Sequence, residues 1–162
     1  MGTTKSRLPV IGWREWVSLP ELGVHRIKAK VDTGARSSSV HAFDVDVFSR
    51  DGYDWVRFGV LPIQGDNSTS VRVEARVVDQ RTVRSSSGEV SMRPVIETTV
   101  RLHGVTWPVE MTLADRQEMR FRMLLGRQAF RGRFLVHAGR SFLGGRPSQD
   151  HSQRASTEDR TS

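Results

Sequence analysis

Seven short runs of β-branched and aromatic residues, most of them separated by turn residues, constrain this chain more than any other feature of its sequence. Strands at this spacing predict a closed or sandwiched all-β domain. Polar and apolar residues alternate within 72–77 and 99–102, as half-buried antiparallel strands require. One short helix is predicted to begin near Gly126 and to include 127–131, with a turn near 115–119. The expected strands cover residues 10–17, 24–31, 40–48, 53–60, 70–78, 95–102 and 106–113.

The length of 162 residues predicts one domain with a single core. We expect a flexible N-terminus over 1–8, a folded domain over 9–143, and a disordered tail over 144–162, where Gly, Pro, Ser, Gln and charged residues replace apolar ones. The chain has no run of about 18 apolar residues and no secretory leader, so a soluble, cytoplasmic protein is expected. The absence of cysteine excludes disulfide frameworks and thiolate chemistry.

The chain carries a net positive charge, and almost all of its basic residues are arginines. Lys and Arg number 25 against 18 Asp and Glu, which gives a net charge of +7. Only Lys5, Lys28 and Lys30 are lysines. Because the guanidinium group forks onto carboxylates and phosphates, this composition favours an anionic partner. A solvated basic surface without a partner explains the same composition, and both interpretations stay open.

The segment most suggestive of chemistry is Asp32-Thr33-Gly34-Ala35, which directly follows an apolar strand. A carboxylate at a strand end is held by the sheet, and the glycine lets the next backbone amides approach it closely enough to donate hydrogen bonds. Taken alone, the Asp-Thr-Gly tripeptide is a weak signal, and an ordinary turn in which Asp caps the loop is the favoured interpretation.

A second motif changes that balance. Met123-Leu124-Leu125-Gly126-Arg127 precedes the predicted helix, and the pairing resembles retroviral-type aspartic proteases, in which such a strand braces the Asp-Thr-Gly-Ala loop. The likeness extends to a bacterial family historically labelled ATP-dependent zinc proteases, now grouped with retropepsin-like peptidases associated with an ATP-grasp glutamate ligase. It covers most of the folded part and is carried by residues 11–17, 30–36, 83–88, 93–96 and 120–127.

The resemblance implies a retropepsin-like closed β-barrel or sandwich with one short C-terminal helix, and an aspartic-type endopeptidase activity. Asp32 would be the catalytic carboxylate, with Thr33 and Gly34 bracing its loop. We expect no metal or nucleotide cofactor, despite the historical label. The five histidines are scattered without a His-Glu-x-x-His motif, and no phosphate-binding glycine loop is present.

Aspartic peptidases use two carboxylates about 3 Å apart that share one proton. The chain has one Asp-Thr-Gly, so a symmetric homodimer in which each copy supplies Asp32 is the simplest arrangement. A monomer that takes its second carboxylate from Asp115 or Asp79 is the alternative. A retropepsin also needs a flap that closes over substrate, and residues 85–89 are our candidate, unless they form an ordinary surface loop.

The resemblance also implies a substrate of α-linked glutamate chains, such as the tail that the associated ligase adds to a small-subunit ribosomal protein. A cleft for such a polyanion needs cations near the scissile bond. Any single one of them could instead serve a structural carboxylate or carbonyl. With Ala35 of the motif, the candidate substrate-binding residues are Lys30, Arg36, Arg84, Arg93, Arg120, Arg122 and Arg127.

Two alternatives without catalysis remain open. One is a basic β-barrel that binds RNA or the ribosome, suggested by pairs such as Arg57-Phe58. The other is a module that binds glutamylated protein without cleaving it. We expect neither a membrane partner nor, on balance, a nucleic-acid partner, and the tryptophans at strand positions, Trp107 among them, are expected to pack in the barrel.

Overall fold

Six strands close into a mixed β-barrel, which confirms the predicted fold class. The computed structural model describes residues 7–84 and 86–145. The closed order is β1-β2-β10-β3-β9-β8, with β1 pairing back to β8 through Ser18 and Arg101. The elements are β1 (Val10–Leu19), the 3-10 helix η1 (Pro20–Leu22), β2 (Val24–Asp32), β3 (Ser38–His41), β4 (Phe43–Arg50), β5 (Tyr53–Val60), β6 (Val71–Arg76), β7 (Asp79–Arg84), β8 (Val90–Leu102), β9 (Val105–Ala114), β10 (Met123–Gly126), α1 (Arg127–Phe130) and β11 (Leu135–Ser141).

The core follows from the two-residue period of the strands. On β2 the side chains of Ile27, Ala29 and Val31 are buried, whereas Lys30 between them is exposed. Burial of this apolar face, together with its counterparts on the other barrel strands, drives closure. A separate sheet of β4, β5 and β6 covers part of the barrel and contributes the buried Val56 and Phe58 to the same core.

The run predicted as one strand over 40–48 is two strands in two sheets. The chain breaks at Ala42, whose N–H donates to the Ala114 carbonyl at 2.9 Å, and then leaves the barrel for the small sheet. Asp44 has a positive φ of 51°, which supports the change of direction.

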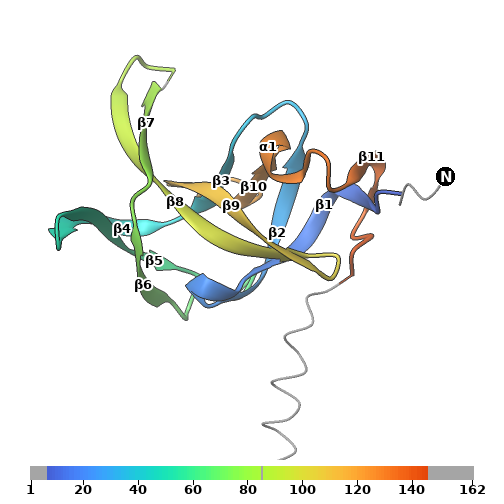
Figure 1. The fold of residues 1–162 in the computed structure, drawn as a ribbon, viewed down its shortest axis with the longest axis horizontal. Coiled ribbons are helices and arrows are strands. Elements are labelled where there is room, and N and C mark those ends of the chain that lie inside the picture. The colour runs from blue at the N-terminus through green and yellow to red at the C-terminus, as the bar shows by residue number, and fades with distance from the viewer. Residues whose placement is uncertain (1–6, 85, 146–162) are drawn as a thin grey trace, which may run out of the picture.

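The hairpin of β7 and the first part of β8 projects away from the barrel (Figure 1). It contains residues 86–89 of the segment predicted as a flap, whereas Ser85 lies outside the described residues. The last paired residues of the hairpin are Arg84 and Val90. The predicted tail begins at Gly144, but Gly144 itself donates its N–H to the buried Glu15 carboxyl at 2.9 Å. The rest of that tail, from residue 146, lies outside the described residues, as do residues 1–6. No helix in the described ranges is long and apolar enough to cross a membrane.

Candidate active site

Asp32 is the last residue of β2 and lies where the strand passes into a tight loop. Its Oδ1 accepts the Gly34 N–H at 2.9 Å, and its carbonyl accepts the Ala35 N–H at 3.2 Å. The backbone therefore fixes both the carboxyl group and the loop after it. The side chain of Asp32 is half-buried, while Thr33 and Gly34 are exposed. This arrangement presents a positioned carboxylate at the surface of the barrel.

The second motif braces this loop from the adjacent strand. The parallel strands β2 and β10 place Gly126 beside Asp32. The Arg127 N–H donates to the Ala35 carbonyl at 2.8 Å, and the Gln128 N–H donates to the Arg36 carbonyl at 3.1 Å. The start of α1 is thus tied to the chain just after the Asp32 loop, so the two motifs found in the sequence meet in space.

Gly126 is required at this junction because the backbones approach too closely for a side chain. A Cβ added to Gly126 would overlap the carbonyl oxygen of Ser37. The Gly126 N–H donates to the buried Ser38 Oγ at 3.0 Å, which satisfies a backbone donor that the close packing removes from water. The Arg127 guanidinium reaches the Thr33 carbonyl at 3.5 Å. Arg127 therefore contacts the Asp32 loop through both its backbone and its side chain.

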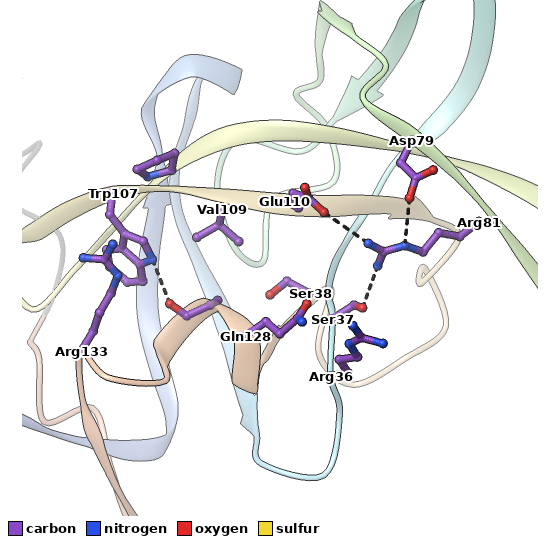
Figure 2. A pocket seen from close by; sticks show the side chains of 12 residues that line it. Arg36, Ser37, Ser38, Asp79, Arg81, Trp107, Val109, Glu110, Gln128 and Arg133 are labelled. Carbon is purple, nitrogen blue, oxygen red and sulfur yellow. Dashed lines mark hydrogen bonds and ion pairs between the residues drawn. The ribbon is translucent and has the colours of Figure 1, made fainter.

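A cavity of about 710 Å³ adjoins the loop on the side of α1 (Figure 2). Arg36 and Ser37, directly after the loop, form part of its wall, and Gln128 of α1 lines it as well. Across the cavity, Arg81 of β7 donates to Ser37 Oγ at 2.6 Å. Its guanidinium also lies 3.3 Å from the Glu110 carboxylate and 3.8 Å from that of Asp79. Arg81 thereby links the projecting hairpin to the segment beside Asp32.

The remaining predicted cations are spread over several surfaces. Lys30 is exposed on β2 two residues before Asp32, on the outward side of the strand. Arg84 ends β7 and is exposed. Arg93 lines a different cavity, of about 380 Å³. Arg120 lies over the ring of Phe121, with its guanidinium carbon 5.7 Å from the ring centroid.

Arg122 is similarly engaged elsewhere, since its guanidinium donates to Asn67 Oδ1 at 2.7 Å. Of the predicted substrate-binding cations, only Arg36 lines the cavity beside the Asp32 loop. The structure thus brings Ala35, Arg36 and Arg127 together around Asp32, and leaves Arg93, Arg120 and Arg122 away from that cavity.

The two aspartates considered as a second carboxylate lie in different places. Asp79 lines the large cavity and faces Arg81. Asp115 lines the other cavity, 3.8 Å from Nδ1 of the buried His41. Burial lowers the pKa of His41, and Asp115 opposes this shift. Among the described residues, no group of three or more His, Cys, Asp or Glu side chains could hold a metal ion.

Most residues of the large cavity were not identified as site residues from the sequence, among them Arg81, Trp107 and Arg133. Arg81 belongs to a polar strand without an apolar alternation, and Trp107 is buried, as its packing role predicts. Arg133 meets Trp107 only through the fold, because 26 residues separate them. No local sequence signal could have joined them.

Comparison with known proteins places this geometry in a family. The model of a family described as "RimB-like: Retropepsin-like aspartic endopeptidase RimB" matches residues 10–147. The chain belongs to this family of aspartic endopeptidases. The match spans both the Asp32 loop and the Gly126 brace, and it confirms the resemblance drawn from those two motifs.

Curated relatives carry a different name, "Probable alpha-L-glutamate ligase". The one from Desulfotalea psychrophila is 42% identical over 152 residues, covering 94% of this chain and 33% of the relative. Relatives from Shewanella pealeana and Parasynechococcus marenigrum are each 47% identical, over 82% and 81% of this chain and 29% and 28% of theirs. The chain therefore spans a third or less of the curated relatives that it matches.

A crystal structure has the same fold. It is that of a Legionella pneumophila protein of unknown function (DUF785), with a TM-score of 0.70 and 23% sequence identity. The similarity covers 84% of this chain and 98% of that one. The barrel fold is thus shared over most of this chain.

Proposed function

We propose that this chain is an aspartic endopeptidase that hydrolyses glutamate-rich peptides, with Asp32 as its catalytic carboxylate. The observation that carries this proposal is the fixed position of Asp32. Its Oδ1 accepts the Gly34 N–H at 2.9 Å, and its loop is hydrogen-bonded to the start of α1. Because the carboxylate is already held in place, little free energy is needed to reorganise it when it acts on a water molecule.

The reaction requires two carboxylates. One activates water as a general base while the other, protonated, donates to the scissile carbonyl oxygen. In the proposed enzyme, two copies of the chain meet at their Asp32 loops and each supplies one aspartate, and the proton belongs to the pair. The exposure of Thr33 and Gly34 supports this arrangement, since both are available for contact with a second loop.

The substrate proposal rests on charge and on the relatives. Arg36 borders the cavity beside the catalytic loop, and the exposed Lys30 lies on the outward side of β2 with Asp32. Cations here would offset repulsion between an anionic substrate and the catalytic carboxylates. The curated relatives are named as alpha-L-glutamate ligases, and this chain matches a part of them. A peptidase that acts on glutamate chains, including glutamylated ribosomal protein, fits both observations.

The β7–β8 hairpin is the proposed flap. Arg81 ties it to Ser37 and Glu110 across the cavity, so a peptide in the cavity would be covered by this hairpin. Closing the hairpin over the substrate would exclude bulk water from the reacting bond.

The function is tested with a peptide panel analysed by mass spectrometry. Oligomers of α-linked glutamate, glutamine and lysine are incubated with the purified chain without added metal or nucleotide. Shortening of the glutamate oligomer alone supports the proposal. Binding of the glutamate oligomer without shortening, at concentrations at which the chain sediments as a dimer, would instead favour a non-catalytic module.

The dimer is tested by sedimentation and by mixing. The active species should sediment at about twice the chain mass of 18.3 kDa. Wild type mixed with excess Asp32→Asn chains should lose activity beyond simple dilution, because mixed dimers hold one carboxylate. An active species that sediments as a monomer would contradict the two-chain site.

A further inference from the structure

The cavity beside the catalytic loop has two ends with different charge states. At the hairpin end, Arg81 is compensated by the carboxylates of Asp79 and Glu110 (Figure 2). At the other end lies Arg133, which has a different environment (Figure 2). Within the described part of the chain, neither Arg133 nor Arg36 forms an ion pair with a carboxylate. The cavity therefore holds two uncompensated guanidinium groups in its wall.

Arg133 is held against a rigid aromatic ring. Its guanidinium carbon lies 5.3 Å from the centroid of Trp107. The Trp107 ring is fixed in turn, because its Nε1 donates to the Ala129 carbonyl at 2.9 Å and Phe134 packs against it with the ring centroids 5.5 Å apart. Trp107 is only 4% exposed. Stacking on a fixed ring restrains the guanidinium while leaving its N–H donors available.

A planar, restrained guanidinium with free donors is suited to a carboxylate, which it can bind with two parallel hydrogen bonds. Resting on the proposed function, we infer that Arg133 is a specificity residue that binds a carboxylate of the substrate at the Trp107 end of the cavity (Figure 2). Arg36 supplies a second cation at the loop side of the same cavity. A neutral peptide would leave both cations without a partner, so the pair favours acidic peptides.

A glutamate chain offers two kinds of carboxylate to this end of the cavity. One is the side chain of a glutamate near the scissile bond, which would allow cleavage within a chain. The other is the terminal α-carboxylate, which would direct cleavage to a fixed distance from the chain end. The chemistry at Arg133 is the same in both cases, and peptide variants separate them.

The test compares Arg133→Gln with Arg131→Gln. Arg131 is exposed and two residues away, so this control removes the same charge from the same segment. For cleavage of oligoglutamate, Arg133→Gln should raise KM by about tenfold or more while kcat changes little. Arg131→Gln should stay near wild type. The Arg133→Lys variant should recover only part of the loss, because a lysine keeps the charge without the fork.

Combining protein variants with modified peptides shows which carboxylate Arg133 binds, the terminal one or a glutamate side chain. Peptides with an amidated C-terminus, or with one glutamate replaced by glutamine, are bound to the inactive Asp32→Asn chain with and without Arg133→Gln. The modification that removes Arg133's partner should weaken binding to the Arg133 chain and have little effect on the Arg133→Gln chain. Thermal melting confirms that each variant is folded.

Failure of the inference about Arg133 and failure of the proposed function would give different results. If wild type cleaves oligoglutamate and Arg133→Gln matches Arg131→Gln in KM, or no peptide modification couples to Arg133, the role of Arg133 is wrong and the proposed function stands. If wild type neither binds nor cleaves oligoglutamate, the proposed function is wrong and the inference falls with it.

Discussion

Asp32 and Gly126 are register partners at the ends of the parallel strands β2 and β10. They come from motifs about 90 residues apart in the sequence. Their pairing brings the start of α1 against the Asp32 loop, where the Arg127 and Gln128 amides donate to the carbonyls of Ala35 and Arg36. The position of the carboxylate thus depends on a backbone contact that admits no side chain at residue 126.

Replacing Gly126 with alanine should therefore damage both stability and activity. The new Cβ would overlap the Ser37 carbonyl, and the loop after Asp32 would have to move. We expect a loss of about 3 kcal/mol in the free energy of unfolding, measured by urea denaturation. Gly139→Ala is the control, because a Cβ there meets only the side chain of His137. Equal stability of the two variants would contradict the close contact.

The contacts by which Arg81 links the β7–β8 hairpin to Ser37 and Glu110 are tested with Arg81→Met. Loss of the contacts to Ser37 and Glu110 should free the β7–β8 hairpin, so its amides should exchange hydrogen faster. If the hairpin is the flap, kcat/KM should also fall by about tenfold. Arg101→Met, at the far end of β8, removes an equal charge and should leave hairpin exchange unchanged. Unchanged exchange in Arg81→Met would show that Arg81 does not restrain the hairpin.

Much of the fold was readable from the sequence because strand formation here depends on local patterns. Strand β5 matches its predicted range, and the predicted helix over 127–131 appears as α1 over Arg127–Phe130. The strands β7 and β11 were not predicted, since most of their side chains are exposed and no apolar alternation marks them. Such strands are defined by pairing with neighbours, which no local window contains.

The candidate site, like the fold, was only partly predictable from the sequence. The Asp32 loop and its brace are short motifs, so both were predictable. The partners of the arginines were not, because they are set by tertiary contacts: Arg122 contacts Asn67, and Arg133 contacts Trp107. Sequence proximity to a motif therefore selected cations such as Arg120 and Arg122 that do not line the cavity, and it passed over Arg133.

Glu15 should be essential for stability although it lies outside the cavity. It is fully buried on β1, and its carboxyl oxygens accept the N–H groups of Gly12 at 2.6 Å, Leu143 at 2.8 Å and Gly144 at 2.9 Å. Glutamine has one acceptor oxygen, so Glu15→Gln should leave buried donors unpaired and cost about 3 kcal/mol in urea unfolding. Glu97→Gln, at an exposed position on β8, should cost little. A Glu15→Gln chain as stable as this control would contradict the role of the three bonds.

Acidification should destabilise the fold through His41. Burial lowers its pKa below the ordinary 6.5, so between the lowered pKa and 6.5 the unfolded chain binds more protons than the folded chain. The stabilising contribution is complete above 6.5 and is lost as pH falls through the lowered pKa. In His41→Asn, whose side-chain oxygen can accept the Arg116 N–H in place of Nδ1, urea unfolding should depend less steeply on pH in this range. Identical pH profiles would exclude His41 as the cause.

The most direct test of the account is the activity of Asp32→Asn beside wild type, on α-linked oligoglutamate and with product masses measured over time. Asparagine keeps an oxygen that can accept the Gly34 N–H, so the variant should fold and melt like wild type. It cannot act as a general base, and turnover should fall at least about a thousandfold. Full activity in a folded Asp32→Asn chain would contradict the assignment of Asp32 as the catalytic carboxylate.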